Sequence, residues 1–368
     1  MIRIKSLLIL SIISLLLISC KETSEQVSFS TDYARGFSVE KNEDYTVVKL
    51  YNPENEQLLE TYILVSKDKD LPENLPEGTL IRTPLKEIAV FSAVTCGMLD
   101  ALGELDVIIG LTEPQYINVP YLQEKLKEEK IIDLGLSYNP DIEKVINLEP
   151  EAIFYNPIPG QEITSLTRQS SPLIHCLDYK ENSTLGQTEW IRLIGLFFEK
   201  EELADSLFYA TRDNYLRLQD LAANVEYQPC VFTELKSSDA WYMPGGKSYL
   251  AEMFKHAGAD YLWKEDTHQG SIPLSFEQVL EEAQNCDIWL IKHFNHTTYE
   301  NLAAEQSNYT LFDAYRNRKI FLCNTSKASY YEDLPLHPDW ILEDFVYIFH
   351  PELLPNYTPR YYFPMENN

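Results

Sequence analysis

The chain is short of basic residues. Its 368 residues include 30 Lys and Arg against 57 Asp and Glu, so the formal net charge at pH 7 is −27. Proteins that bind nucleic acid or an anionic membrane surface need clustered Lys and Arg. The charge balance therefore argues against both as main partners. It does not identify a partner, because excess acid is also a common way to keep a protein soluble.

The sequence also lacks the short motifs of common catalytic and metal sites. It contains no G-x-S-x-G turn for a nucleophilic serine and no H-E-x-x-H zinc motif. The seven histidines are scattered, and only His293 and His296 are close enough along the chain to share a site. Asn295 and Thr297 beside them are more typical of a solvated loop. We therefore predict no catalytic residues, no metal ligands and no cofactor.

Cysteine is scarce, and no pair has the C-x-x-C spacing of a metal or redox site. After Cys20, an odd number of cysteines remains, in or beside short apolar runs. We expect these to be buried free thiols, although one disulfide is left open and the spacing does not select it. They are Cys96, Cys176, Cys230, Cys286 and Cys323.

The N-terminus resembles the signal peptide of a bacterial lipoprotein. Arg3 and Lys5 precede an apolar run over residues 6–18 that is too short to span a bilayer comfortably. The run ends in Leu-Ile-Ser-Cys, similar to a lipobox, in which Cys20 is acylated and becomes the first mature residue. An uncleaved signal anchor is the alternative. We predict a signal peptide over residues 1–19 and a protein held in the periplasm by lipid on Cys20.

The rest of the chain divides by its hydrophobic patterns. Residues 20–83 read as a tether and a β-rich extension, because polar and apolar residues alternate over 27–66 as in antiparallel strands. Residues 84–187 and 226–368 alternate apolar strands with helices, which predicts two α/β lobes with parallel sheets. The intervening stretch, residues 188–225, has no proline and is rich in helix formers. We predict one long helix there that joins the lobes.

Five segments, in this order and spacing, resemble a known family. They are IAVFSAVTCGMLDALGELDVIIGLT, NPDIEKVINLEPEAIFYN, WYMPGGKSYLAEMFKHAGADYLW, LSFEQVLEEAQNCDIWLI and PLHPDWILEDFVYIFHPELL, between residues 85 and 354. Together they are similar to the periplasmic substrate-binding proteins of ABC importers for iron–siderophore complexes, haem and cobalamin. The resemblance implies two Rossmann-like lobes joined by a single backbone helix. The β-rich extension falls outside it.

A cleft for a bulky chelate needs aromatic walls and a few polar anchors. The chain has 24 tyrosines, many at the ends of predicted strands. In open α/β sheets ligands bind beyond the carboxyl ends of the strands. This rule predicts ligand-binding residues in the first lobe at Ser92, Ala93, Val94, Thr95, Tyr116, Tyr155 and Asn156, and in the second lobe at Trp241, Tyr242, His293, Phe294, Lys327, Tyr330 and Tyr331.

Two glutamates stand near the start of a predicted helix, one in each lobe. They are Glu143 in D-I-E-K-V and Glu277 in S-F-E-Q-V. An acidic side chain there also stabilises a helix through its dipole. In the family that the chain resembles, a glutamate at each matching place docks on arginines of the membrane permease. The resemblance therefore implies this role for Glu143 and Glu277.

These observations predict a lipid-anchored binding protein, monomeric, that captures an iron–siderophore complex or haem and delivers it to an ABC importer permease. A cobalamin-binding protein of the same class is the nearest alternative. The alternative from another class is a chelatase-like enzyme on the same two-lobed frame. Against it stands the lack of a paired nucleophile and base, and for it only His293 near His296.

The anchor can be tested with Cys20→Ala. We expect this variant to leave the membrane fraction, because Cys20 is the attachment point of the lipid that holds the protein. The measurement is the distribution of the protein between pellet and supernatant after a high-salt wash of membranes. Retention of the variant in the pellet would show that the lipobox interpretation is wrong.

Overall fold

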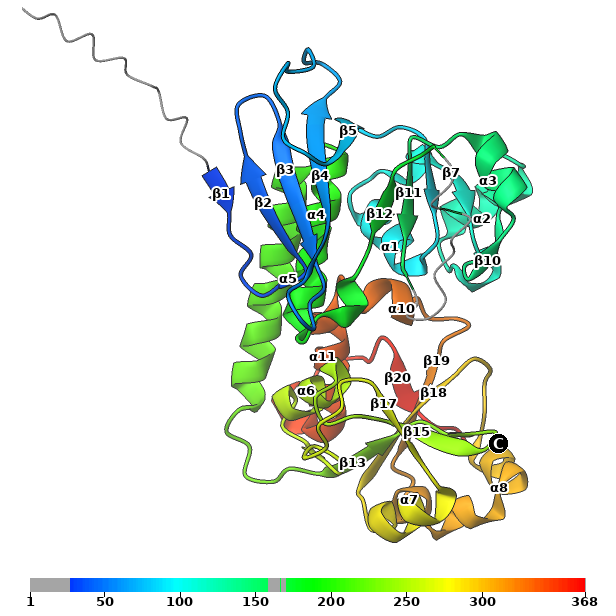
Figure 1. Ribbon diagram of the computed structural model, residues 1–368. Helices are drawn as coiled ribbons and strands as arrows, with labels where there is room; N and C mark the ends of the chain where they lie inside the picture. The colour runs from blue at the N-terminus through cyan, green and yellow to red at the C-terminus, as the bar shows by residue number, and fades with distance from the viewer. Residues whose placement is uncertain (1–26, 158–165, 167–169, 368) are drawn as a thin grey trace, which may run out of the picture.

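The computed structural model describes residues 27–157, 166 and 170–367. The predicted signal peptide and Cys20 lie outside the described residues. Two α/β lobes lie one above the other in Figure 1, and a long helix runs along one side. A separate β-sheet covers that helical side next to the first lobe. Among the described residues, no helix is both long enough and apolar enough to cross a membrane.

The N-terminal extension forms one five-stranded sheet in sequence order. The first four strands pair antiparallel, as the alternation predicted. The fifth pairs parallel with the fourth, and it lies beyond residues 27–66, where the alternation was found. The strands are β1 (Val27–Phe29), β2 (Phe37–Lys41), β3 (Thr46–Tyr51), β4 (Leu58–Ser66) and β5 (Thr79–Thr83).

The first lobe has a five-stranded parallel sheet in the order β12-β11-β6-β7-β8, which confirms the parallel α/β pattern. Its strands are β6 (Ile88–Val90), β7 (Ile108–Leu111), β8 (Ile132–Asp133), β11 (Ala152–Tyr155) and β12 (Leu173–His175). Its helices are α1 (Ala93–Ala101), α2 (Pro120–Lys127) and α3 (Ile142–Leu148). A short antiparallel pair, β9 (Gly135–Leu136) and β10 (Asn139–Pro140), precedes α3.

The prediction of one continuous helix over residues 188–225 is wrong at residues 198–200. Two helices occupy this part of the chain, α4 (Thr184–Phe197) and α5 (Glu201–Ala222). Glu199 between them has a left-handed φ of 56°, which ends α4 and reverses the chain. The two helices pack as an antiparallel hairpin, with Arg192 Nε 2.6 Å from Asp205 Oδ1. A Cβ on Gly195 would lie 2.7 Å from that of Ala204, so glycine permits this close approach.

Helix α5 alone is therefore the connecting helix. It packs on α4 on the side of the first lobe and on α11 (Pro338–Phe349) and α6 (Tyr249–His256) of the second lobe. Of its leucines, Leu218 is buried and Leu203 is exposed. Continuous packing against both lobes makes α5 a structural spine (Figure 1).

The second lobe has a five-stranded sheet in the order β16-β13-β18-β19-β20, parallel except for β20. The strands are β13 (Cys230–Thr233), β16 (Asp260–Tyr261), β18 (Ile288–His293), β19 (Ile320–Asn324) and β20 (Tyr362–Pro364). A small antiparallel sheet joins β14 (Lys236–Ser237), β15 (Ala240–Pro244) and β17 (Ser271–Leu274). The remaining helices are α7 (Phe276–Ala283), α8 (Tyr299–Glu305), α9 (Asp313–Arg316) and α10 (Tyr330–Asp333).

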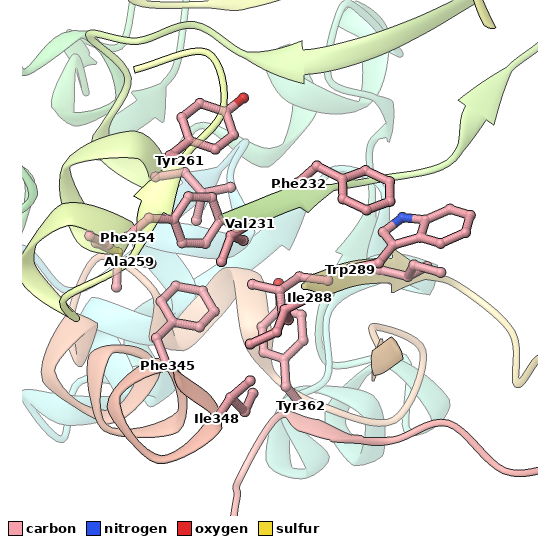
Figure 2. Packing of buried hydrophobic residues seen from close by; sticks show 14 of the residues in the cluster. Val231, Phe232, Phe254, Ala259, Tyr261, Ile288, Trp289, Phe345, Ile348 and Tyr362 are labelled. Carbon is pink, nitrogen blue, oxygen red and sulfur yellow. The ribbon is translucent and has the colours of Figure 1, made fainter. Parts of the chain in front are cut away.

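Each lobe has its own hydrophobic core. Figure 2 shows part of the second, in which Phe232 stacks on Trp289 with ring centroids 5.0 Å apart. The core of the first lobe also includes the inner face of the extension, where Phe37 contacts Trp190 and Tyr62 contacts Phe197, both on α4. The extension is thus packed into the first lobe through a shared core.

One disulfide is present in the second lobe, between Cys230 and Cys286. The expectation of free thiols is wrong for this pair, because the fold brings together two residues 56 positions apart. It is correct for Cys96, Cys176 and Cys323, which are free and buried.

Two buried carboxylates fasten the start of the extension to α4. Glu189, which is 0% exposed, accepts hydrogen bonds from the backbone N–H groups of residues 32, 33 and 34 and pairs with Arg192 Nη1 at 2.8 Å. Glu181 accepts from the N–H groups of residues 35 and 36 and from Trp190 Nε1. These bonds satisfy both the carboxylates and the backbone N–H groups of residues 32–36.

We expect Glu189→Gln to destabilise the protein by about 3–5 kcal/mol, because a neutral amide replaces the buried carboxylate that accepts from three backbone N–H groups and Arg192, although Arg192 keeps its pair with the half-exposed Asp205. The measurement is the free energy of unfolding from urea titration. Glu40→Gln is a matched control in the extension, since Glu40 forms a half-exposed pair with Lys49 and its loss costs about 1 kcal/mol or less. Equal effects of the two substitutions would contradict the anchoring role of Glu189.

Candidate functional site

A cavity of about 380 Å³ opens at the carboxyl ends of β13 and β18 in the second lobe. Its charged and aromatic lining comes from Glu234, Tyr242, Tyr249, Lys292 and Tyr331. Gln269 on its rim donates a hydrogen bond to Asn182 Oδ1 of the first lobe, at 2.5 Å. The cavity therefore lies where the two lobes approach each other, at the edge of the sheet where the strand-end rule places ligands.

A largely buried ion pair lines this cavity. Lys292 Nζ lies 2.6 Å from Glu234 Oε1, and the two side chains are only 12% and 22% exposed. Burial by itself lowers the pKa of Lys292, but the attraction of Glu234 and the neighbouring tyrosines outweighs it, so the pKa is raised well above its ordinary value. Lys292 is therefore a cation at physiological pH, paired with a carboxylate that directly follows the adjacent strand β13.

Tyrosines surround the pair. Lys292 Nζ lies 5.6 Å from the ring centroid of Tyr330, a cation–π distance. Burial raises the pKa of Tyr249 and of Tyr331, so both phenols are neutral at physiological pH. A neutral phenol can donate and accept a hydrogen bond. The cavity thus combines aromatic surface with uncharged polar groups around one neutralised cation.

Two of the residues predicted from strand ends line this cavity, Tyr242 and Tyr331. Lys327 lines a different hollow of about 330 Å³, next to β20. Tyr116 and Phe294 come from different lobes, and their rings meet edge to face with centroids 6.4 Å apart. Both are exposed, so this contact bridges the lobes at the surface.

Several predicted residues are buried instead. Trp241 is 0% exposed, stacks on Phe276 and donates from Nε1 to the carbonyl of Thr233. It alternates with exposed Tyr242 along β15, and neither composition nor position says which of the two faces the core. Its assignment to the ligand site is corrected: it is a core residue.

Thr95, Tyr155 and Tyr330 are likewise buried. Thr95 points its hydroxyl at Cys176 Sγ, 3.8 Å away, and Tyr155 packs edge to face on Phe91. Direct ligand contact through the side chains of Thr95 and Tyr155 does not agree with this packing. Tyr330 does not line the cavity itself, but its ring lies against Lys292, which does.

The other predicted residues of the first lobe lie at strand ends as expected. Ser92 precedes α1, and Ala93 and Val94 form its first turn, all half-buried. Asn156 follows β11, and its buried Oδ1 has no hydrogen-bond partner among the described residues. Residues 158–165 lie outside the described residues. Ligand contact by these four residues stays a prediction.

The two histidines do not form a common site. His293 Nδ1 accepts a hydrogen bond from the backbone N–H of Asn295, which closes a local turn. His296 Nε2 lies 3.4 Å from Glu366 instead. In the part of the chain that the structure describes, no group of three or more His, Cys, Asp or Glu side chains could hold a metal ion.

Glu143 and Glu277 are both exposed, in the first turns of α3 and α7. Asp141 and Ser275 cap these helices, and Ser275 forms a capping box with Gln278. The helix starts are therefore stabilised without the two glutamates. Both glutamates are therefore available at the surface, and their helices α3 and α7 lie on different lobes (Figure 1).

Sequence reasoning missed Glu234, Tyr249 and Lys292. A signal for Lys292 exists, since it is the single cation at the end of the apolar run CDIWLIKHF, directly before His293. Glu234 follows β13 in the same way. On β18 the strand-end rule selected His293, one residue beyond Lys292. It was not applied to β13, which Glu234 follows.

Comparisons with known proteins match this two-lobed frame. Residues 88–326 match a family model described as periplasmic binding protein. An uncharacterized lipoprotein of Methanocaldococcus jannaschii is 27% identical over 326 residues, which cover 83% of this chain and 77% of that protein.

Solved structures share the fold. One, described as an ABC-type Fe3+-hydroxamate transport system from Saccharomonospora viridis, has a TM-score of 0.56 at 18% identity and covers 73% of this chain and 94% of its own. Another, a periplasmic haem-binding protein from Pseudomonas aeruginosa, has a TM-score of 0.57 at 16% identity and covers 73% and 93%.

Proposed function

The chain belongs to the periplasmic binding protein family, and from this premise we propose that it is a lipid-anchored protein that captures an iron complex and delivers it to an ABC importer. Members of this family are solute-binding proteins, so the protein binds its ligand without making or breaking bonds and is not an enzyme. The ligand is an iron–siderophore complex or haem.

The tyrosine-lined cavity is the observation that carries this proposal. It presents Tyr242, Tyr249 and Tyr331 beside a neutralised Lys292, at the edge where the lobes meet. Aromatic walls with a few convergent polar groups suit a bulky chelate. Two proteins of similar fold are described as an Fe3+-hydroxamate transport system and a haem-binding protein, which supports the same ligand class.

A corrinoid is the second candidate, because tyrosine-rich walls suit its large ring equally well. A chelatase-like enzyme is no longer a candidate, since the family consists of solute-binding proteins. The partners of the protein in this proposal are the permease of the importer and the membrane that holds the lipid on Cys20. The protein acts as a monomer and binds no nucleic acid.

The ligand can be identified by purifying the protein from its host and recording an absorption spectrum. Haem, corrinoids and ferric siderophores absorb visible light at different wavelengths. We expect a visible band that dialysis against a competing chelator or apo-protein removes. A protein that carries no such band, and takes up none when incubated with these compounds, would contradict the proposal.

Docking on the permease is tested by Glu143→Ala combined with Glu277→Ala. We expect uptake through the cognate importer to collapse, because a permease arginine left without its carboxylate costs about 2–5 kcal/mol at a docked interface. Ligand affinity and melting temperature should hold, since both glutamates are exposed and outside the cavity. Glu128→Ala, another exposed glutamate, is the control. A parallel loss of ligand affinity would place Glu143 and Glu277 in the binding site instead.

A further inference from the structure

The residues that line the cavity have no net charge. Lys292 and Glu234 are the only charged residues among its described lining, and they are paired at 2.6 Å. The other polar side chains of the lining are uncharged and belong to Ser237, Tyr242, Ser248, Tyr249, Gln269, Ser271 and Tyr331. A ligand in this cavity therefore meets a wall with strong hydrogen-bonding groups and no net charge.

Glu234 occupies an unfavourable backbone position. Its φ is 66°, in the left-handed region that favours glycine and asparagine over other residues. The conformation is held because its N–H donates to the carbonyl of Leu290 and its carbonyl accepts from Trp289 Nε1. These two backbone hydrogen bonds hold Glu234 at the end of β13, where its carboxylate lies 2.6 Å from Lys292 Nζ at the cavity.

The pair can serve a ligand that both donates and accepts hydrogen bonds. The Lys292 ammonium has three N–H donors, and Glu234 Oε1 takes one, which leaves donors for a ligand carbonyl. The second oxygen of Glu234 can accept from a ligand N–H or O–H. An amide offers both groups a short distance apart. An anionic ligand oxygen that approaches Lys292 also comes close to the Glu234 carboxylate, which repels it.

We propose that this cavity binds the uncharged, amide- or hydroxamate-bearing rim of a metal chelate, and that Glu234 discriminates against anionic chelates. This inference rests on the proposed function and narrows its ligand class. It favours uncharged ferric hydroxamates and corrinoids over ferric catecholates and over haem bound through its carboxylates. Without Glu234, the positive charge of Lys292 would favour anionic chelates instead.

The test is calorimetric titration of the purified protein with four probes. Ferrichrome and cyanocobalamin are uncharged and carry amides, whereas ferric enterobactin and haemin are anionic. We expect one uncharged probe to bind at least about tenfold more tightly than either anionic probe. The comparison of ferrichrome with cyanocobalamin distinguishes a hydroxamate ligand from a corrinoid.

Glu234→Gln then tests the origin of the selectivity. It keeps the size of the side chain and frees the charge of Lys292, so we expect affinity for the anionic probes to rise by about tenfold or more. Glu277→Gln, at an exposed glutamate of the same lobe, should leave all affinities unchanged. If Glu234→Gln does not fold, as judged by circular dichroism, Lys292→Met combined with Glu234→Gln removes both charges, and it should lose the discrimination between the two classes.

The outcomes separate the two proposals. The role of Glu234 would be overturned if the anionic probes bound the native protein as tightly as the uncharged ones. It would also be overturned if Glu234→Gln or the double variant folded and kept the selectivity of the native protein. Either result would leave the proposed function standing. A native protein that binds none of the four probes would contradict the proposed function itself.

Discussion

The buried carboxylate of Glu189 is the constraint on which the arrangement of the first lobe depends. An ionised carboxylate removed from water is unfavourable unless its oxygens are fully paired. Three backbone N–H groups at the start of the extension and Arg192 supply that pairing. The carboxylate can therefore be buried only if the N-terminal chain lies across α4, and this contact brings the five-stranded sheet onto the helix.

The same contact explains why every residue of α4 is buried. One side of the helix faces the extension, where Trp190 and Phe197 meet aromatic residues of the sheet. Another side faces α5, where Gly195 allows a close approach. Its first residue, Thr184, donates to Glu252 of the second lobe from both N and Oγ1. Helix α4 is thus the point at which the extension, the connecting helix and both lobes are joined.

The candidate ligand site is formed by residues at strand ends, and no residue of α4 lines it. The parallel strands β13 and β18 bring Glu234 and Lys292 side by side at one edge of the sheet. Helix α10 packs on α1 of the first lobe, and Glu332 accepts a hydrogen bond from the N–H of Asn118 there. Tyr331 is carried on α10, so the cavity receives a residue whose position depends on contact between the lobes.

The sequence by itself determined the two α/β lobes and a long helix between them, and it predicted the edge of the sheet at which the candidate site lies. These depend on local periodicity and on the order of strands, which the chain carries directly. Only the tertiary structure decided that Trp241 is buried while Tyr242 lines the cavity, because the face of a strand depends on its pairing partners. It also decided the Cys230–Cys286 disulfide and the pairing of Lys292 with Glu234, since each joins residues more than fifty positions apart. Such pairs follow from how strands are laid side by side, and no local pattern in the sequence records that.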